Sequence, residues 1–123
     1  MPINPTYLAA TSRSSLSAAD ARSRVLSLYR AWQRGAPSIL ELYSLDVTIP
    51  QARNKIRREF EKNRFVTSLP AIDVLHFKGY AEYHETMNFF KQVTHIMKYF
   101  RIEEEPRVQL PTSFVGRFLE GRN

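Results

Sequence analysis

The side chains best suited to chemistry in this sequence are arginines that recur along one predicted helix. Residues 53–64 contain six basic and two acidic side chains, six minus two or a net charge of +4. At roughly 100° per residue, Arg53, Arg57 and Arg64 fall on one side of this helix, next to its apolar face. Guanidinium groups bind carboxylates and phosphates through charge-assisted, often bidentate hydrogen bonds. The pattern predicts a docking surface for an acidic group; the alternative is a solvated face with local Glu–Arg pairs.

The three histidines are the second set of candidates, and their spacing does not form a site. His84 has acidic neighbours but lacks the histidine four residues away that a helical zinc pair requires. The sequence has no glycine-rich phosphate loop, no serine elbow and no cysteine. We therefore expect no catalytic residue and no metal site, and we interpret His76, His84 and His95 as solvent-facing.

Composition narrows the partner without identifying it. The chain has 123 residues, enough for one domain, and its formal charge of +6 favours nucleic acid, an anionic membrane or an acidic protein. Its basic side chains cluster beside an apolar face, without a recognition-helix arrangement or an aromatic-plus-glycine RNA motif, which favours a protein over nucleic acid. No apolar run approaches the roughly 20 residues of a membrane-spanning helix, so we expect no transmembrane segment.

The element preceding the basic helix is predicted to be an amphipathic helix. Ser17 is a good N-cap, and Asp20 in the first turn favours the positive end of the helix dipole. The helix is expected to end near Arg34, because Gly35 suits a C-terminal position and Pro37 does not continue the pattern. A separate helical turn is expected at residues 39–43. Arg24 and Arg34 are predicted to point away from the apolar face, which comprises Ala18, Ala21, Val25, Leu28, Tyr29 and Trp32.

Two further helices complete the predicted domain. Thr48 and Gln51 form a capping box that starts a helix at Ile49, and this helix should run to about Arg64. A third helical region is expected from about Ile72 to Arg101, with a break or bend at Gly79 near its start. The predicted apolar face of the second helix comprises Ile49, Ala52, Ile56 and Phe60. The predicted buried face of the third comprises Tyr83, Met87, Phe90, Val93, Thr94 and Met97.

We predict an all-α, three-helix domain over residues 17–101. An extended N-terminal arm is expected over residues 1–16, and its Ser- and Arg-bearing, acid-poor start is compatible with mitochondrial import. An extended C-terminal tail is expected over residues 102–123. Its aromatic side chains have no core of their own, which suggests a segment laid across a partner.

Leu28-Tyr29-Arg30, followed by Phe60 in a basic second helix, resembles the LYR family. Motifs further along resemble the branch of this family found in the peripheral arm of mitochondrial respiratory complex I. They include Leu28-Tyr-Arg-Ala-Trp32, Leu45-Asp46 with Thr48, Lys62-Asn63 with Val66-Thr67, Lys78-Gly79, Glu85-Thr86, Lys91-Gln92 with Thr94-His95 and Met97, and Glu105-Pro106-Arg107. The resemblance spans roughly residues 22–118.

The resemblance implies a three-helix LYR-type bundle that is a non-catalytic accessory subunit of complex I. Such a protein would lie peripherally on the matrix side of the mitochondrial inner membrane, near the ubiquinone-reducing region. It would bind the mitochondrial acyl carrier protein and would have no cofactor of its own. The acyl-4′-phosphopantetheine of the carrier would insert between the helices. An LYR adaptor for another mitochondrial assembly and a basic nucleic-acid-binding module are the alternatives.

The resemblance also implies residue roles. Arg22, Arg57 and Arg64 match carrier-facing basic positions, whereas Glu61 stands at another such position; Arg53 joins this set from helix geometry alone. The candidate acyl-chain tunnel comprises Val25, Leu28, Ile56, Phe60, Met87 and Phe90, all of which would also suit an ordinary core. Candidates for docking on the rest of the complex are Phe89, Ile96, Phe114 and Phe118.

Overall fold

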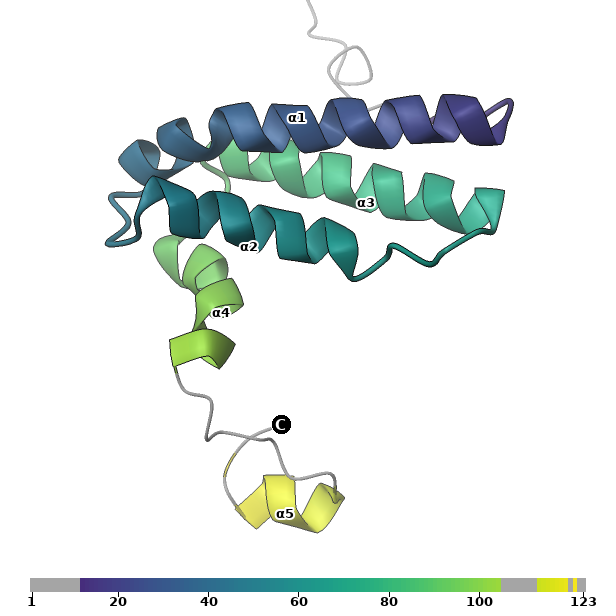
Figure 1. The fold of residues 1–123 in the computed structure, drawn as a ribbon. Helices are drawn as coiled ribbons and strands as arrows, with labels where there is room; N and C mark the ends of the chain where they lie inside the picture. The colour runs from purple at the N-terminus through teal and green to yellow at the C-terminus, as the bar shows by residue number, and fades with distance from the viewer. Residues whose placement is uncertain (1–11, 105–112, 120, 122–123) are drawn as a thin grey trace, which may run out of the picture. The chain divides into compact units, whose positions relative to one another are not determined.

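The computed structural model describes residues 12–104, 113–119 and 121, and every regular element among them is an α-helix (Figure 1). The elements are α1 (Ala18–Leu42), α2 (Ile49–Glu61), α3 (Leu69–Met87), α4 (Val93–Glu104) and α5 (Phe114–Leu119). The predicted all-α class with three main helices is therefore confirmed. The helices α1–α3 belong to one compact unit, which ends at Val93, and the rest of α4 and α5 belong to a second. Most of the predicted N-terminal arm lies outside the described residues.

Helix α1 begins as predicted but runs eight residues further than expected. The Ser17 hydroxyl accepts a hydrogen bond from the Asp20 N–H at 3.3 Å. The predicted end near Arg34 was wrong, because Pro37 lies inside the helix. A proline has no N–H for the carbonyl four residues earlier, here that of Gln33. Arg53 of α2 supplies a replacement, since its Nε donates to the Gln33 carbonyl at 3.3 Å.

Both α1 and α3 end in a Schellman motif without glycine. At the end of α1, Leu45 N–H donates to the Leu40 carbonyl and Ser44 N–H to the Glu41 carbonyl, with Ser44 at φ +50°. At the end of α3, Phe90 N–H donates to the Glu85 carbonyl and Phe89 N–H to the Thr86 carbonyl. Phe89 has φ +60°, a conformation that is rare for a bulky side chain.

The predicted third helix is therefore two helices, and Gly79 does not break the first of them. Gly79 lies within α3, where a Cβ would be only 3.0 Å from Cδ2 of Leu28, so glycine permits a close approach of α1 and α3. The break comes after Met87. It removes Phe90, Val93 and Thr94 from the predicted buried face, and all three are exposed.

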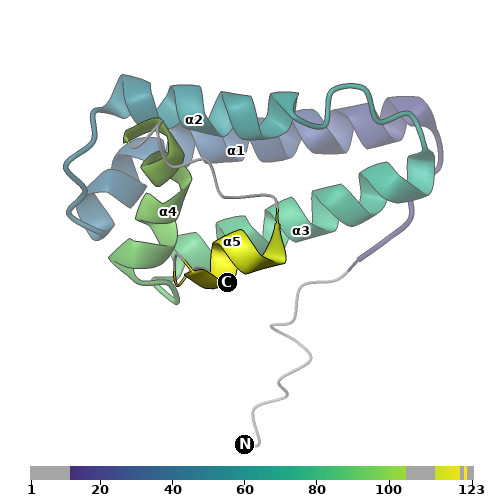
Figure 2. The same ribbon diagram turned by 90° about the horizontal axis from the view of Figure 1, so that it is seen from below.

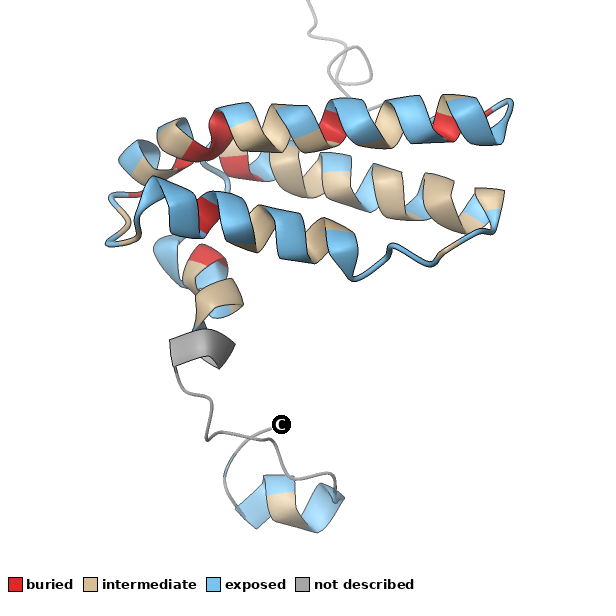
Figure 3. Cartoon of the chain, viewed as in Figure 1, coloured by how far each residue is buried: buried red, intermediate tan, exposed pale blue. Residues whose placement is uncertain are grey.

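Helix α1 packs against both α2 and α3, whereas α2 and α3 do not pack extensively against each other (Figure 2). The Thr48–Gln51 capping box that starts α2 is confirmed, and α2 ends at Glu61 rather than at Arg64. Most buried positions of this unit lie on α1 (Figure 3). None of the large side chains is completely buried in the described parts of the chain, so the core is thin.

In the second unit, the tail predicted as extended contains the six-residue helix α5. The rings of Phe114 and Phe118, one turn apart, stack with their centroids 6.4 Å apart. Both side chains are exposed.

Candidate functional site

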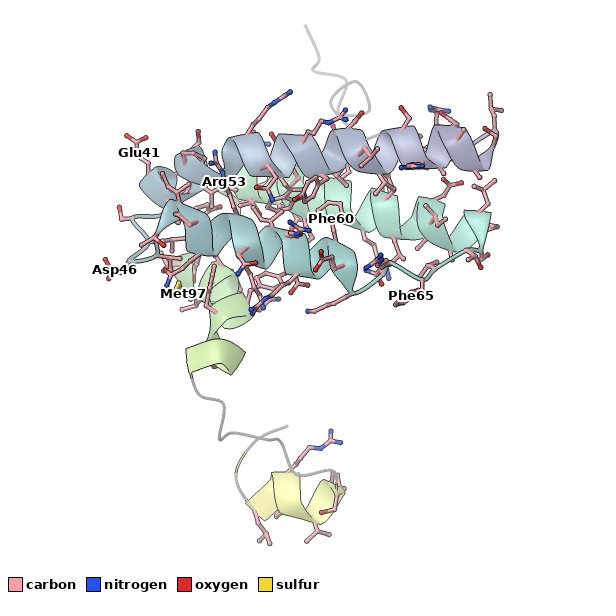
Figure 4. The ribbon with its side chains drawn as sticks, in the orientation of Figure 1. Glu41, Asp46, Arg53, Phe60, Phe65 and Met97 are labelled. Carbon is pink, nitrogen blue, oxygen red and sulfur yellow. The ribbon has the colours of Figure 1, made fainter. Side chains whose placement is uncertain are left out.

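The tripeptide Leu28-Tyr29-Arg30 joins α1 to both of its neighbours, because consecutive helical residues point in different directions. Leu28 is buried and approaches Gly79 of α3. Tyr29 is half-buried and meets Phe60 of α2 edge to face, with ring centroids 5.2 Å apart. Arg30 is exposed. The leucine and the tyrosine thus hold α3 and α2 onto α1, and the position of Phe60 on α2 is shown in Figure 4.

The four arginines predicted to face a partner are all exposed, but their surroundings differ. Arg57 Nε donates to Glu61 Oε1 at 2.9 Å, and this hydrogen bond is the main cause of the raised pKa of Arg57. Arg64 lies over the ring of Phe65, with Cζ 5.8 Å from the centroid. Arg22 is exposed on α1. A local Glu–Arg pair, the alternative considered from the sequence, is therefore present at Arg57.

Arg53 has a structural contact that the helical wheel did not predict. Besides its Nε donation to the Gln33 carbonyl, its own carbonyl accepts a hydrogen bond from the Gln33 side-chain amide at 3.1 Å. The labelled position of Arg53 on α2 is consistent with this contact to α1 (Figure 4). Arg53 therefore links the two helices in the free chain.

The candidate tunnel residues are only partly brought together. Val25, Ile56, Phe60 and Met87 are half-buried, and Leu28 is buried. Met87 lies at the interface of α1 and α3, where its Sδ would be 3.3 Å from a Cβ placed on Gly35. Phe90 stands apart beyond the end of α3, with 70% of its surface exposed. Its ring neighbour is His84, at a centroid distance of 6.2 Å.

The candidate docking residues also differ in exposure. Phe89 is 56% exposed, and its ring centroid lies 4.9 Å from that of Tyr43. The Tyr43 hydroxyl donates to the Thr86 carbonyl at 2.8 Å, which fixes the ring beneath Phe89. Ile96 is buried, whereas Phe114 and Phe118 are exposed.

A cluster of polar side chains joins the start of α1 to the start of α3, and sequence reasoning missed it. The Ser15 hydroxyl donates to Asp73 Oδ1 at 2.5 Å, and the Ser15 N–H donates to Asp73 Oδ2 at 2.9 Å. Arg24 Nη1 donates to Ser15 Oγ at 2.8 Å and to Asp73 Oδ1 at 3.2 Å, and Arg24 Nη2 lies 3.5 Å from His76 Nδ1.

Two predictions are corrected by this cluster. Arg24 does not point away from the fold but pairs with Asp73, and His76 is half-buried rather than solvent-facing. Hydrogen bonds from Ser15, and then the charge of Arg24, lower the pKa of Asp73. Burial, and then the charge of Arg24, lower the pKa of His76. Arg24 and Asp73 are 49 positions apart, so no local signal in the sequence pairs them.

The described part of the chain contains neither a metal site nor a membrane-spanning helix. No group of three or more His, Cys, Asp or Glu residues there could hold a metal ion. None of the described helices is long and apolar enough to cross a membrane.

Three helices tied together by a Leu-Tyr-Arg tripeptide and a phenylalanine, with arginines along the second helix, define an LYR-type bundle. The chain belongs to the complex 1 protein (LYR) family, whose model matches residues 23–85. The resemblance seen in the motifs is thus confirmed.

Two relatives carry the same name, NADH dehydrogenase (ubiquinone) 1 alpha subcomplex subunit 6. The protein from Dictyostelium discoideum is 33% identical over 86 residues, which cover 70% of this chain and 69% of the relative. The protein from Arabidopsis thaliana is 36% identical over 87 residues, which cover 69% of this chain and 65% of the relative.

Proposed function

We propose that this chain is a non-catalytic accessory subunit of mitochondrial respiratory complex I. The two relatives are named as subunits of NADH dehydrogenase (ubiquinone). The region matched by the family model includes α2, most of α3 and the part of α1 that carries the LYR tripeptide. In this role the chain lies peripherally on the matrix side of the inner membrane. It supports the assembly, stability and activity of the peripheral arm near the site of ubiquinone reduction.

Its partner in that role is the acylated mitochondrial acyl carrier protein. The observation that carries this proposal is the arrangement of the three helices. Helices α2 and α3 do not pack extensively against each other, and apolar side chains along the bundle are half-buried, among them Ile56 on α2 and Met87 on α3. An acyl chain inserted between the helices would complete their burial, with a gain of about 0.8 kcal/mol per CH₂ before the entropy of ordering the chain is subtracted.

The exposed arginines provide the second half of the binding site. Arg22, Arg57 and Arg64 would pair with carboxylates of the carrier, which favours a fast and specific encounter. Glu61 already holds Arg57, so a carrier carboxylate would compete with this pair or share the guanidinium. Arg53 would serve the interface chiefly by holding α2 on α1.

The surfaces left exposed after the carrier binds would dock on the rest of the complex. Phe89 supports this role, because its ring is displayed by a backbone conformation that few bulky residues adopt. Phe114 and Phe118 of α5 present a second aromatic pair. Ile96 is buried in the free chain, so it would act by supporting its neighbours or after a local rearrangement.

The proposal is tested by purifying the tagged chain from mitochondria and measuring the intact masses of its small partners. We expect an acidic protein whose mass includes acyl-4′-phosphopantetheine, and migration of the chain with complex I on native gels. Retention of the carrier with migration in another assembly would favour the alternative LYR adaptor. Recovery of nucleic acid without the carrier would favour the nucleic-acid-binding module and overturn the proposal.

A further inference from the structure

Phe65 is the most exposed aromatic side chain in the described part of the molecule, with 88% of its surface accessible. It lies in the connection between α2 and α3, where its position is marked in Figure 4. Folding alone gives no reason for a phenylalanine here, because an exposed ring contributes nothing to the core.

The backbone around Phe65 is held by hydrogen-bonded turns. The N–H groups of Asn63, Arg64 and Val66 donate to carbonyls three residues earlier, at 3.1–3.2 Å. The ring is therefore displayed from a defined segment. Binding of a partner over the ring therefore costs less conformational entropy than binding to a loose loop would.

A cation borders the ring. The Arg64 guanidinium lies over one face of Phe65, and Arg57, which pairs with Glu61, lies near the same end of α2. Another exposed apolar side chain, Leu16 at 90% exposure, precedes α1 at this end of the three-helix unit, where α1 and α3 both begin (Figures 1 and 2). Apolar anchors bordered by cations complement an acidic protein surface that has an apolar depression.

We propose that Phe65 is the apolar anchor of the interface with the acidic carrier protein. Its ring enters an apolar depression on the carrier, while Arg64 beside it pairs with a carboxylate of the same protein. This inference rests on the proposed function. It adds an apolar residue to an interface that was so far described only by its arginines. An aromatic anchor also gives selectivity, because acidity alone does not distinguish the carrier from other acidic proteins.

The test measures the affinity of the full chain for purified acyl carrier protein bearing acyl-phosphopantetheine, by titration calorimetry at two salt concentrations. Phe65→Ala should raise the Kd at least about tenfold at both salts, as expected for an aromatic hot spot. Phe65→Leu should recover most of the affinity. Arg57→Glu should show a loss that changes with salt, because charge pairs are screened. Because Phe65 is exposed, thermal unfolding of its variants should match that of the parent.

Leu42→Ala is the matched control, an exposed apolar residue at the opposite end of α1, and it should leave the Kd within about twofold. If Phe65→Ala binds the carrier like the parent while Arg57→Glu does not, the anchor is refuted and the proposed function stands. If the parent does not bind the carrier, both fail. Parent binding to cardiolipin-containing vesicles or to a single-stranded oligonucleotide, lost in Phe65→Ala while carrier affinity is kept, would also overturn the assignment.

Discussion

Arg53 donates from Nε to the carbonyl of Gln33, the acceptor that Pro37 leaves without its helical partner. The Gln33 side chain returns a hydrogen bond to the Arg53 carbonyl. One pair of residues thus bridges a gap in the hydrogen bonding of α1 and fastens α2 beside it. A 25-residue helix thus continues past a proline, with the carbonyl that the proline leaves unpaired accepting from a side chain of another helix.

This relationship predicts a coupling between Arg53 and Pro37. Arg53→Ala should lower the free energy of unfolding by about 0.5–1.5 kcal/mol, because it leaves the Gln33 carbonyl to water. In a Pro37→Ala background the loss should shrink, since the N–H of the new residue can donate to that carbonyl. Urea unfolding of the parent, both single variants and the double variant measures the coupling. Strictly additive losses would contradict this account of the proline.

The two Schellman motifs predict unequal responses to glycine. Ser44→Gly should stabilise the chain by about 1 kcal/mol, because Ser44 has φ +50° and glycine adopts this conformation without strain. Phe89→Gly should stabilise it less or destabilise it, since relief of the same strain is offset by loss of the ring contact with Tyr43. Thermal unfolding of the two variants provides the comparison. Equal stabilisation by both would show that the Phe89–Tyr43 contact contributes nothing.

Acid should weaken the fold in two steps through the polar cluster. The folded-state pKa of His76 lies below its ordinary value of 6.5, so the unfolded chain binds more protons between the two values. The contribution of His76 to stability is present above pH 6.5 and is lost as the pH falls through the folded-state pKa. The pKa of Asp73 is also lowered, from 3.8, so its contribution is present above pH 3.8 and is lost at lower pH.

Unfolding midpoints measured across these ranges test both steps. His76→Gln should remove the step just below pH 6.5. Asp73→Asn should reduce the step below pH 3.8, to which Asp20 also contributes because hydrogen bonds from Arg13 and the Leu16 N–H lower its pKa. His84→Gln, a change at an exposed histidine, is the control and should keep both steps. Identical pH profiles for His76→Gln and the parent would show that the cluster does not govern the first step.

Arg57→Glu should weaken carrier binding at least about tenfold, because in the proposed complex the reversed charge would face a carrier carboxylate at a site from which water is excluded. The new side chain also sits one turn from Glu61, so unfolding must be measured with binding to separate a small loss of helix stability. Lys62→Glu is the matched reversal on the far side of the predicted arginine stripe, and it should have a smaller effect. Similar binding by Arg57→Glu and the parent at low and at physiological salt would contradict a role for the stripe.

The starts of α1 and α2 were predicted correctly from the sequence. The Ser17 cap and the Thr48–Gln51 capping box depend only on residues three apart, and both are present. The helix ends were missed where the determining contact is distant or the residue atypical. Pro37 was expected to stop α1 because Arg53 could not be placed beside Gln33, and Phe89 gave no C-terminal signal because glycine usually holds that position.

The candidate site shows the same division. The leucine, tyrosine and phenylalanine of the motif pack as joints between helices, which the apolar periodicity indicates. The Arg24–Asp73 pair crosses between α1 and α3, so it requires the packing of the two helices to be known. Phe90 was assigned to the tunnel on the assumption of one continuous third helix, and the break after Met87 places it elsewhere.

The sparse contact between α2 and α3 has a mechanical consequence. Each of these helices is fastened to α1, so their separation can change by pivoting on α1 without disrupting a shared seam. A longer or bulkier acyl chain would then require only a shift of α2 and α3 relative to α1. Such a bundle would accept acyl chains of several lengths, so the length that it binds would be set by the acyl chains available in the cell.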